Sequence, residues 1–373
     1  MKRQQERRVE SLLDYIQVMK EERLEECISR GENARYPQIC AAAFRRNGSL
    51  DIQAMVDEFQ SYIGNSLTEM QNRHFLAFSQ HYGLPTNLLD FSYSPLISLY
   101  FACSGNEEKE GYVYFLSKER LIDITRNLDL VKPGLFSQLL LAAPKTEALY
   151  DGITKFFCQD VRYVAEFLEG IDRMIGRLPR NERVHRALRQ ALRTIRTEGV
   201  CSMDDLEFLI KILDRNRPFA GELEPEIKTK YLGAFGHIFC RVLSYAFLIR
   251  DKDAKLEFPF YFTYEPANIT ARVSNQSSIL IYQLYGIDNL RQAIIPDFEV
   301  TIANKEEILS DLDHLGINEK FIFNDYDHIA SYIKRKHLKT ADETEEKWTK
   351  IQKMAGEFPI RKGIWYQQHK KEV

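Results

Sequence analysis

Strand-forming runs lie on both sides of a long helical block in this 373-residue chain. They cover 111–117, 258–264, 279–285 and 290–296, where aromatic and β-branched residues cluster between turn residues. From about 119 to 250 the pattern is helical almost throughout. A single α+β fold, with a mixed sheet interrupted by a helical insertion, explains this order more simply than two tandem domains.

This pattern predicts the domain organisation. Residues 1–118 and 256–338 are expected to form one discontinuous α+β domain, with 119–255 as its helical insertion and a charged tail over 339–373. A chain of this length can bury either two cores or one core with an insertion.

Apolar residues at helical spacing predict further elements in the two outer parts of the chain. The expected helices cover about 5–25, 67–82, 304–315 and 325–337, and FIF at 321–323 is expected to be a short strand. Gly83 and Pro85 are expected to end the second of these helices. Ser94 and Pro95 then suit a helix start, and the apolar run that follows predicts a buried helix up to Cys103.

Composition narrows the class of partner. The net charge is −3 and 28% of residues are charged, which does not indicate a globally basic nucleic-acid binder. No run approaches the 18 or more apolar residues of a membrane span, and the N-terminus has no apolar signal core. A location in the cytoplasm and no membrane partner are therefore expected.

Cysteine spacing and missing motifs exclude several kinds of site. The cysteines are Cys27, Cys40, Cys103, Cys158, Cys201 and Cys240, with no C-x-x-C pair, so we expect reduced thiols and no metal site. The chain also lacks a P-loop, a Rossmann glycine motif, an H-E-x-x-H pair and a G-x-S-x-G elbow.

The stretch QHYGLPTNLLDFSYSPLISLYFAC, residues 80–103, places many hydrogen-bonding side chains beside an apolar run. It resembles the signature of the FRG-domain family, whose usual form is close to QHxGLPTRLLDWTxxPLxALYFA. Upstream, ISRGENARYPQICAAAFRR resembles the family's FRGQ…PSLFR segment, with Arg30 and Gly31 at the motif that names the family. Downstream, ARVSNQSSILIY resembles R-I-x-x-Q-x-G-x-F through Arg272 and Gln276.

The resemblance covers about 25–103 and 258–337, where GINEKFIFNDYDHIASYIK is similar to the family's closing segment. The sequence departs from the usual motif at Ser29, Asn87, Phe91, Ser278 and Leu280. The Asn at position 87 replaces an Arg, so an anion-binding role at that position is not expected to carry over.

The resemblance to this mainly bacterial and phage-associated family implies a link to defence or toxin-like systems. Arg30 followed by Gly31 is similar to the Arg-Gly with which many ADP-ribosyltransferases hold NAD, but no Ser-Thr-Ser partner is present. The resemblance therefore points to a transferase that uses NAD or another nucleotide. The alternative is a non-catalytic sensor or adaptor that binds a ligand or phage component.

Two residues are the candidate catalytic pair. Arg30 can clamp a phosphate or carboxylate, or it can be a buried arginine that bonds carbonyl groups and Asp90. His81 can act as a general base or orient a ribose hydroxyl, or it can cap the end of its helix.

The remaining candidates are ligand-binding residues. They are Arg30, Gly31, Glu32, Gln80, Tyr82, Thr86, Asp90, Arg272 and Gln276. At most one of Gln80 and Tyr82 is expected to face the same pocket as His81. Thr86 can bond locally in the turn. Asp90 can accept backbone N–H groups, or pair with Arg30 or His81.

The helical block contains an arginine stripe. Arg183, Arg186, Arg189, Arg193 and Arg196 share one helical face. The stripe can grip nucleic-acid phosphates or an acidic partner, or it can be a solvated face with local ion pairs.

Overall fold

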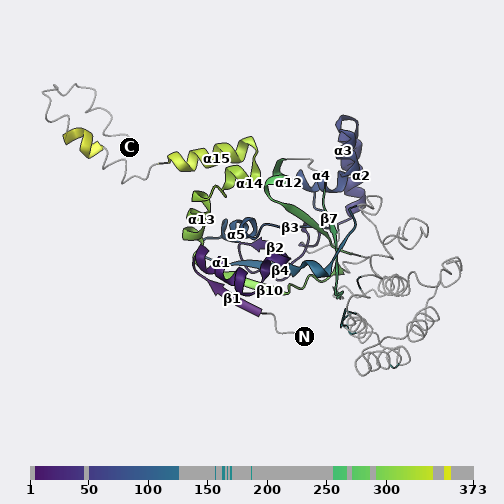
Figure 1. The fold of residues 1–373 in the computed structure, drawn as a ribbon. Coiled ribbons are helices and arrows are strands. Elements are labelled where there is room, and N and C mark those ends of the chain that lie inside the picture. The colour runs from purple at the N-terminus through teal and green to yellow at the C-terminus, as the bar shows by residue number, and fades with distance from the viewer. Residues whose placement is uncertain are drawn as a thin grey trace.

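The computed structural model describes residues 5–45, 50–125, 255–266, 271–285, 291–338 and 348–353, together with positions 156, 162, 163, 166, 169 and 186 (Figure 1). The fold is α+β, as predicted, and is built on an eight-stranded mixed sheet of order β1-β10-β4-β2-β3-β8-β7-β5. The strands are β1 (Gln5–Val9), β2 (Cys27–Glu32), β3 (Leu88–Ser92), β4 (Gly111–Ser117), β5 (Leu121–Asp123), β7 (Tyr261–Tyr264), β8 (Ser278–Tyr282) and β10 (Phe298–Ile302).

Strands from both sides of the helical block lie next to each other in this sheet. The N-terminal strand β1 pairs in parallel with β10, and β10 pairs in antiparallel fashion with β4. On the other side, β3 pairs with β8, and β8 with β7. The division into a discontinuous domain and an insertion remains a prediction, because residues 126–254 lie almost entirely outside the described part.

The helices surround the sheet (Figure 1). They are α1 (Leu12–Glu21), α2 (Ile52–Ile63), α3 (Glu69–Arg73), α4 (Phe75–His81), α5 (Pro95–Cys103), α12 (Ala271–Asn275), α13 (Lys305–His314), α14 (Glu319–Phe323) and α15 (Tyr326–His337). Short 3₁₀ turns cover Leu24–Glu26, Ala42–Phe44, Gly64–Ser66 and Lys118–Arg120. None of the helices in the described residues is long and apolar enough to cross a membrane.

The buried helix α5 is the centre of the core. It packs with α1 and α13 on one face of the sheet, where Leu99, Val113, Val300 and Ile308 are fully buried. Its backbone lies so close to β2 that a Cβ on Gly31 would overlap the Ser98 carbonyl oxygen. The glycine of the Arg-Gly pair is therefore needed for helix–strand packing.

The predicted start of α5 is confirmed in position but not in its bonding. Ser94 is the N-cap residue and Pro95 is the first helical residue. The Ser94 side chain makes no capping bond, and instead the Ser94 N–H donates to Ser92 Oγ at 2.9 Å. Gly83 has φ +91, the left-handed conformation expected of a residue that ends a helix.

The prediction of one helix over 5–25 was wrong in its first third. Residues Gln5–Val9 form β1, because they add an edge strand to β10. The helix begins only at Leu12, where Ser11 Oγ accepts from the Asp14 N–H at 3.1 Å. Local apolar spacing gave no sign of this long-range pairing.

Two other predicted elements were wrong in type or extent. The helix expected over 67–82 is two helices, α3 and α4, which meet at His74 with φ −107. FIF is not a strand but the end of α14, where Asn318 caps the helix by accepting from the Phe321 N–H at 3.1 Å. An N-cap three residues before an apolar triplet favours a helical turn over a strand.

The strand at 111–117 and the helices at 304–315 and 325–337 are confirmed. The strands expected over 258–264 and 279–285 are shorter, as β7 and β8. The strand expected over 290–296 is β9 (Arg291–Gln292), which does not join the main sheet but pairs with β6 (Lys255–Leu256). The sequence did not predict β2, β3, β6 and β10. It did not predict β5 either, which joins the main sheet although the pattern from about 119 onward indicates helix.

Candidate functional site

The candidate site lies where β2 and β3 separate. Within the described sheet these strands pair at Ser29 and Ser92 alone. Beyond that pair, Arg30 Nη1 donates to the Asp90 carbonyl oxygen at 2.8 Å. Two adjoining cavities of about 220 Å³ each open beside this point.

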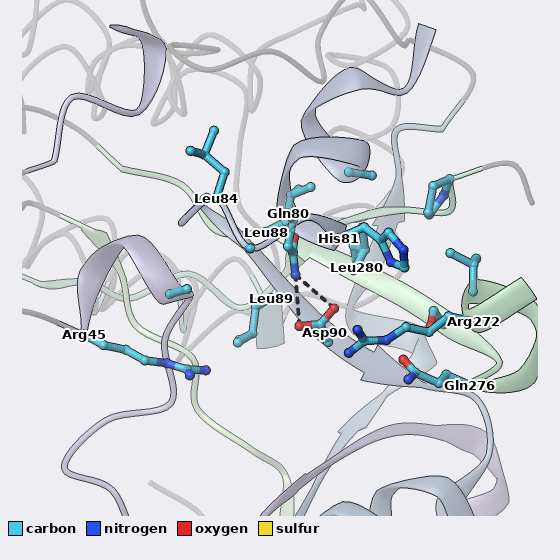
Figure 2. Close-up of a pocket in the computed structure, with 16 residues that line it drawn as sticks. Arg45, Gln80, His81, Leu84, Leu88, Leu89, Asp90, Arg272, Gln276 and Leu280 are labelled. Carbon is cyan, nitrogen blue, oxygen red and sulfur yellow. Dashed lines mark hydrogen bonds between the residues drawn. The ribbon is translucent and has the colours of Figure 1, made fainter. Parts of the chain in front are cut away.

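The first cavity lies between α4, β3, β8 and α12 (Figure 2). Its walls are Ala42, Arg45, Ala77, Gln80, His81, Gly83, Leu84, Leu88, Leu89, Asp90, Pro266, Arg272, Val273, Gln276, Ser278 and Leu280. Figure 2 shows Arg45 and Arg272 approaching from opposite sides, with Asp90 between them. The cavity thus combines apolar walls with a few charged groups, which is typical of a small-molecule site.

The second cavity lies on the α5 side. It is lined by Ser29, Arg30, Gly31, Phe91, Ser92, Ile97, Ser98 and Phe101, and by Arg45, Asp90, Arg272, Gln276 and Ser278, which it shares with the first cavity. The structure therefore places His81 and Gln276 in one cavity and Arg30 and Gln276 in the other.

A hydrogen-bonded chain fixes the carboxylate of Asp90. Gln80 Nε2 donates to both carboxylate oxygens at 2.9 Å, and Gln80 Oε1 accepts from Thr86 Oγ1 at 3.1 Å. The buried Thr86 in turn accepts from the Leu88 N–H at 3.2 Å. Asp90 is therefore oriented by Gln80, and neither Arg30 nor His81 bonds its side chain.

Arg30 is held on both sides. Its Nε donates to Glu32 Oε1 at 3.0 Å, besides the bond from Nη1 to Asp90. The side chains of Arg30 and Glu32 are 12% and 6% exposed. These contacts fit the alternative in which Arg30 is a buried structural arginine that bonds a carbonyl group. A ligand-clamping role for Arg30, Gly31 or Glu32 remains a prediction.

The guanidinium groups of Arg45 and Arg272 make fewer hydrogen bonds than that of Arg30 within the described residues. Arg45 Nε donates to the Cys40 carbonyl at 3.2 Å, which leaves its two terminal nitrogens without a partner in the described residues. Arg272 lies over the Phe323 ring, 5.0 Å from its centroid, and makes no hydrogen bond or ion pair in the described part of the chain. Both groups can therefore donate to an anion.

His81 lines the first cavity and is half-buried. Burial lowers its pKa, and the nearby Arg272 lowers it further, although Asp325 acts in the opposite direction. The imidazole is therefore neutral near pH 7 and can accept a proton. The helix end is closed instead by the N–H groups of Tyr82, Gly83 and Leu84, so His81 is not the cap.

Two other residues lie differently from what their motif positions suggest. Tyr82 is 63% exposed and lines neither cavity. Asn87 is fully buried and donates to the Gln283 carbonyl at 3.1 Å, away from both cavities. The position where the family usually has Arg thus joins the residue before β3 to the residue after β8.

Gln276 connects the site to two neighbouring segments. Its side-chain Nε2 donates to the Ile322 carbonyl at 3.3 Å, and its backbone carbonyl accepts from Ser92 Oγ at 2.7 Å. Gln276 also lines both cavities, at the wall that they share.

Sequence reasoning missed Arg45. It ends the segment that resembles FRGQ…PSLFR, but no role was expected for it. The adjacent Phe44 and Arg45 were the available signal. In the structure they end a 3₁₀ turn at which Phe44 is buried and Arg45 is exposed.

The metal ligands and the arginine stripe considered from the sequence are the last two features to place. Within the described residues no cluster of three or more His, Cys, Asp or Glu side chains could hold a metal ion. Of the arginine stripe only Arg186 is described, as an exposed helical residue. Arg183, Arg189, Arg193 and Arg196 lie outside the described residues, so nucleic-acid or partner binding there stays a prediction.

Comparison with known proteins identifies a domain in the N-terminal part of the chain. The family model described as FRG domain matches residues 25–111. The chain therefore carries an FRG domain, as the motif at residues 80–103 predicted. No curated protein and no solved structure matches the chain significantly.

Proposed function

We propose that this FRG-domain protein binds a phosphorylated nucleotide in the first cavity. The observation that carries the proposal is the convergence of Arg45 and Arg272, from segments far apart in the chain, on one cavity with apolar walls. Two guanidinium groups can hold a phosphate by charge-assisted hydrogen bonds, while Leu84 and Leu280 offer apolar surface to a base.

Asp90 and His81 supply the remaining chemistry of this site. The carboxylate of Asp90, held by Gln80, can accept hydrogen bonds from ribose hydroxyls. With NAD as donor, the C1′–nicotinamide bond would break, nicotinamide would leave with the bonding electrons, and an acceptor would bond to C1′. The neutral imidazole of His81 would take the proton of the acceptor. This would make the protein a transferase acting as a defence or toxin effector.

Calorimetric titration of the full chain with ADP and with NAD tests the binding step. Arg45→Gln and Arg272→Gln should each weaken binding at least tenfold, because each removes a charge-assisted contact. Arg73→Gln is the matched control, since Arg73 is an exposed arginine of α3 that lines neither cavity. Absence of binding for both ligands would refute the nucleotide proposal.

A second candidate function is the non-catalytic sensor or adaptor. It is favoured by the fact that several polar side chains of the site are already paired, as in Gln80 with Asp90 and Arg30 with Glu32. Toxicity on overexpression distinguishes the two. Toxicity that requires His81 in a variant that still folds supports transfer chemistry, whereas toxicity independent of His81, or none, supports the sensor; Arg30 is less informative here because its contacts also hold the fold.

A further inference from the structure

The two cavities share one wall, and that wall is the most strongly charged part of the site. Arg45, Asp90, Arg272, Gln276 and Ser278 line both of them. An anion held between Arg45 and Arg272 therefore lies at the junction of the cavities and not at the far end of either one. Groups attached to two sides of such an anion would point into different cavities.

The size of the cavities supports a ligand that fills both. Each measures about 220 Å³. Sites that enclose a complete small-molecule ligand usually measure roughly 300–1,000 Å³. One cavity alone falls below that range, whereas the two together lie within it.

The unshared walls of the two cavities differ in chemistry. The first offers Ala77, Leu84 and Val273, a largely apolar surface against which a ring can pack. The second offers the ring of Phe101 and the guanidinium of Arg30, while the hydroxyls of Ser92 and Ser98 there are buried and already bond the Gln276 carbonyl and the Ser29 hydroxyl. An aromatic base that packs on Phe101, as part of a nucleoside, suits the second cavity as well.

Resting on the nucleotide site proposed above, we infer that the ligand is a dinucleoside diphosphate. Its diphosphate contacts Arg45 and Arg272 along the shared wall, where their two positive charges outweigh the single carboxylate of Asp90 that lies between them in Figure 2, and one nucleoside occupies each cavity. Gln276 and Asp90, which also line both cavities, face the two sugars on either side of the diphosphate.

Competition between the two halves of NAD tests this arrangement. The full chain is titrated with NAD, with AMP and with nicotinamide mononucleotide, and then with nicotinamide mononucleotide in saturating AMP. We expect NAD to bind at least tenfold more tightly than either half, because linking two halves makes the second contact intramolecular. We also expect saturating AMP to change the affinity for nicotinamide mononucleotide by less than threefold.

Two variants locate the halves. Leu84 lines only the first cavity and Phe101 only the second, and both are partly exposed. Leu84→Ala and Phe101→Ala should each weaken NAD binding. Each should weaken one mononucleotide at least fivefold and leave the other within twofold. Thermal unfolding without ligand shows that both variants are folded.

The outcomes separate this inference from the proposed function. If AMP displaces nicotinamide mononucleotide, if NAD binds no better than ADP, or if both variants weaken the same mononucleotide, the ligand occupies one cavity and the inference is overturned. Nucleotide binding at Arg45 and Arg272 would survive those results. If ADP, NAD and both halves all fail to bind, the proposed function itself falls.

Discussion

Arg30 Nη1 donates to the backbone carbonyl of Asp90 at 2.8 Å, beyond the one residue pair at which β2 and β3 are joined. The Arg30 side chain thus connects β2 to β3 at a point where their backbones no longer pair. The gap that this leaves in the sheet is where the two cavities open. Arg30, a motif residue that looks like a ligand clamp, thus holds β2 and β3 together at the point where the site opens.

Removal of Arg30 should destabilise the fold. Arg30→Met would leave the Glu32 carboxylate buried with neither oxygen bonded, since Glu32 Oε2 already has no partner in the described residues. We expect a loss of about 2–4 kcal/mol in the free energy of unfolding, measured by urea denaturation.

The matched control is the double variant Arg30→Met with Glu32→Gln. Because it removes the unpaired carboxylate, it should recover part of the lost free energy. If the free energy of unfolding of Arg30→Met falls by less than ~0.5 kcal/mol, Arg30 does not stabilise the fold, and a ligand-binding role becomes the better explanation of its position.

Substitution of Gly31 should test the close packing of β2 on α5. In Gly31→Ala the new Cβ would overlap the Ser98 carbonyl oxygen and press on the Ala102 nitrogen. Overpacking of this kind costs about 1–3 kcal/mol or more, seen as a lower midpoint in chemical denaturation. Gly64→Ala is the control, because its nearest contact would be Gln60 Cγ at 3.5 Å. Equal effects at the two glycines would contradict the prediction.

Restoring the usual arginine at position 87 should not create an anion site. Asn87 is fully buried and its amide bonds the Gln283 carbonyl, so Asn87→Arg would force a guanidinium into packed space. We expect a lower melting temperature and no gain in affinity for ADP. Asn72→Arg, on the exposed surface of α3, controls for added charge. Tighter ADP binding by Asn87→Arg without loss of stability would be the opposite outcome.

The buried His74 should make stability depend on pH. Burial chiefly, and Arg73 secondarily, lower its pKa below the usual 6.5, and its ring bonds the Tyr264 hydroxyl. The unfolded chain then binds the proton more readily than the folded protein, so stability is lost as pH falls below about 6.5. We expect the stability advantage of wild type over His74→Gln to shrink between about pH 8 and pH 5, as followed by urea midpoints. A constant difference would contradict it.

Arg272 should influence the titration of His81. Because Arg272 is the second cause of the lowered pKa of His81, Arg272→Gln should raise that pKa but leave it below the usual 6.5, since burial is the larger cause. The ring proton shifts of His81 in an NMR titration measure this. No shift relative to the Arg73→Gln control would place the arginine farther from the imidazole than the structure has it.

The elements predicted correctly are those whose own residues determine them. The run before Cys103 is apolar on all sides and forms a buried helix wherever it lies, and Gly83 with Pro85 ends the helix before it. Strands β1 and β3 could not be found in this way. Gln5–Val9 is charged and becomes a strand only because β10 offers an unpaired edge.

The candidate site shows the same limit. The family motif located Gln80, His81, Asp90, Arg272 and Gln276, which the structure brings to one cavity. It could not show that Asn87 points away or that Arg45 reaches the cavity, because both depend on how separate loops pack. Side-chain direction at a turn is set by tertiary contacts and not by the motif itself.

The pairing of Gln5 with Phe298 has a consequence for the order in which the chain folds. During synthesis, β1 and β4 leave the ribosome long before β10, and β3 long before β8, the late strands that pair with them. Until β10 arrives, the inner strand β4, buried on both faces in the finished sheet, has an unsatisfied edge. Such long-range pairing slows folding and exposes the nascent chain to aggregation. A chain that stops before residue 298 would remain in that exposed state.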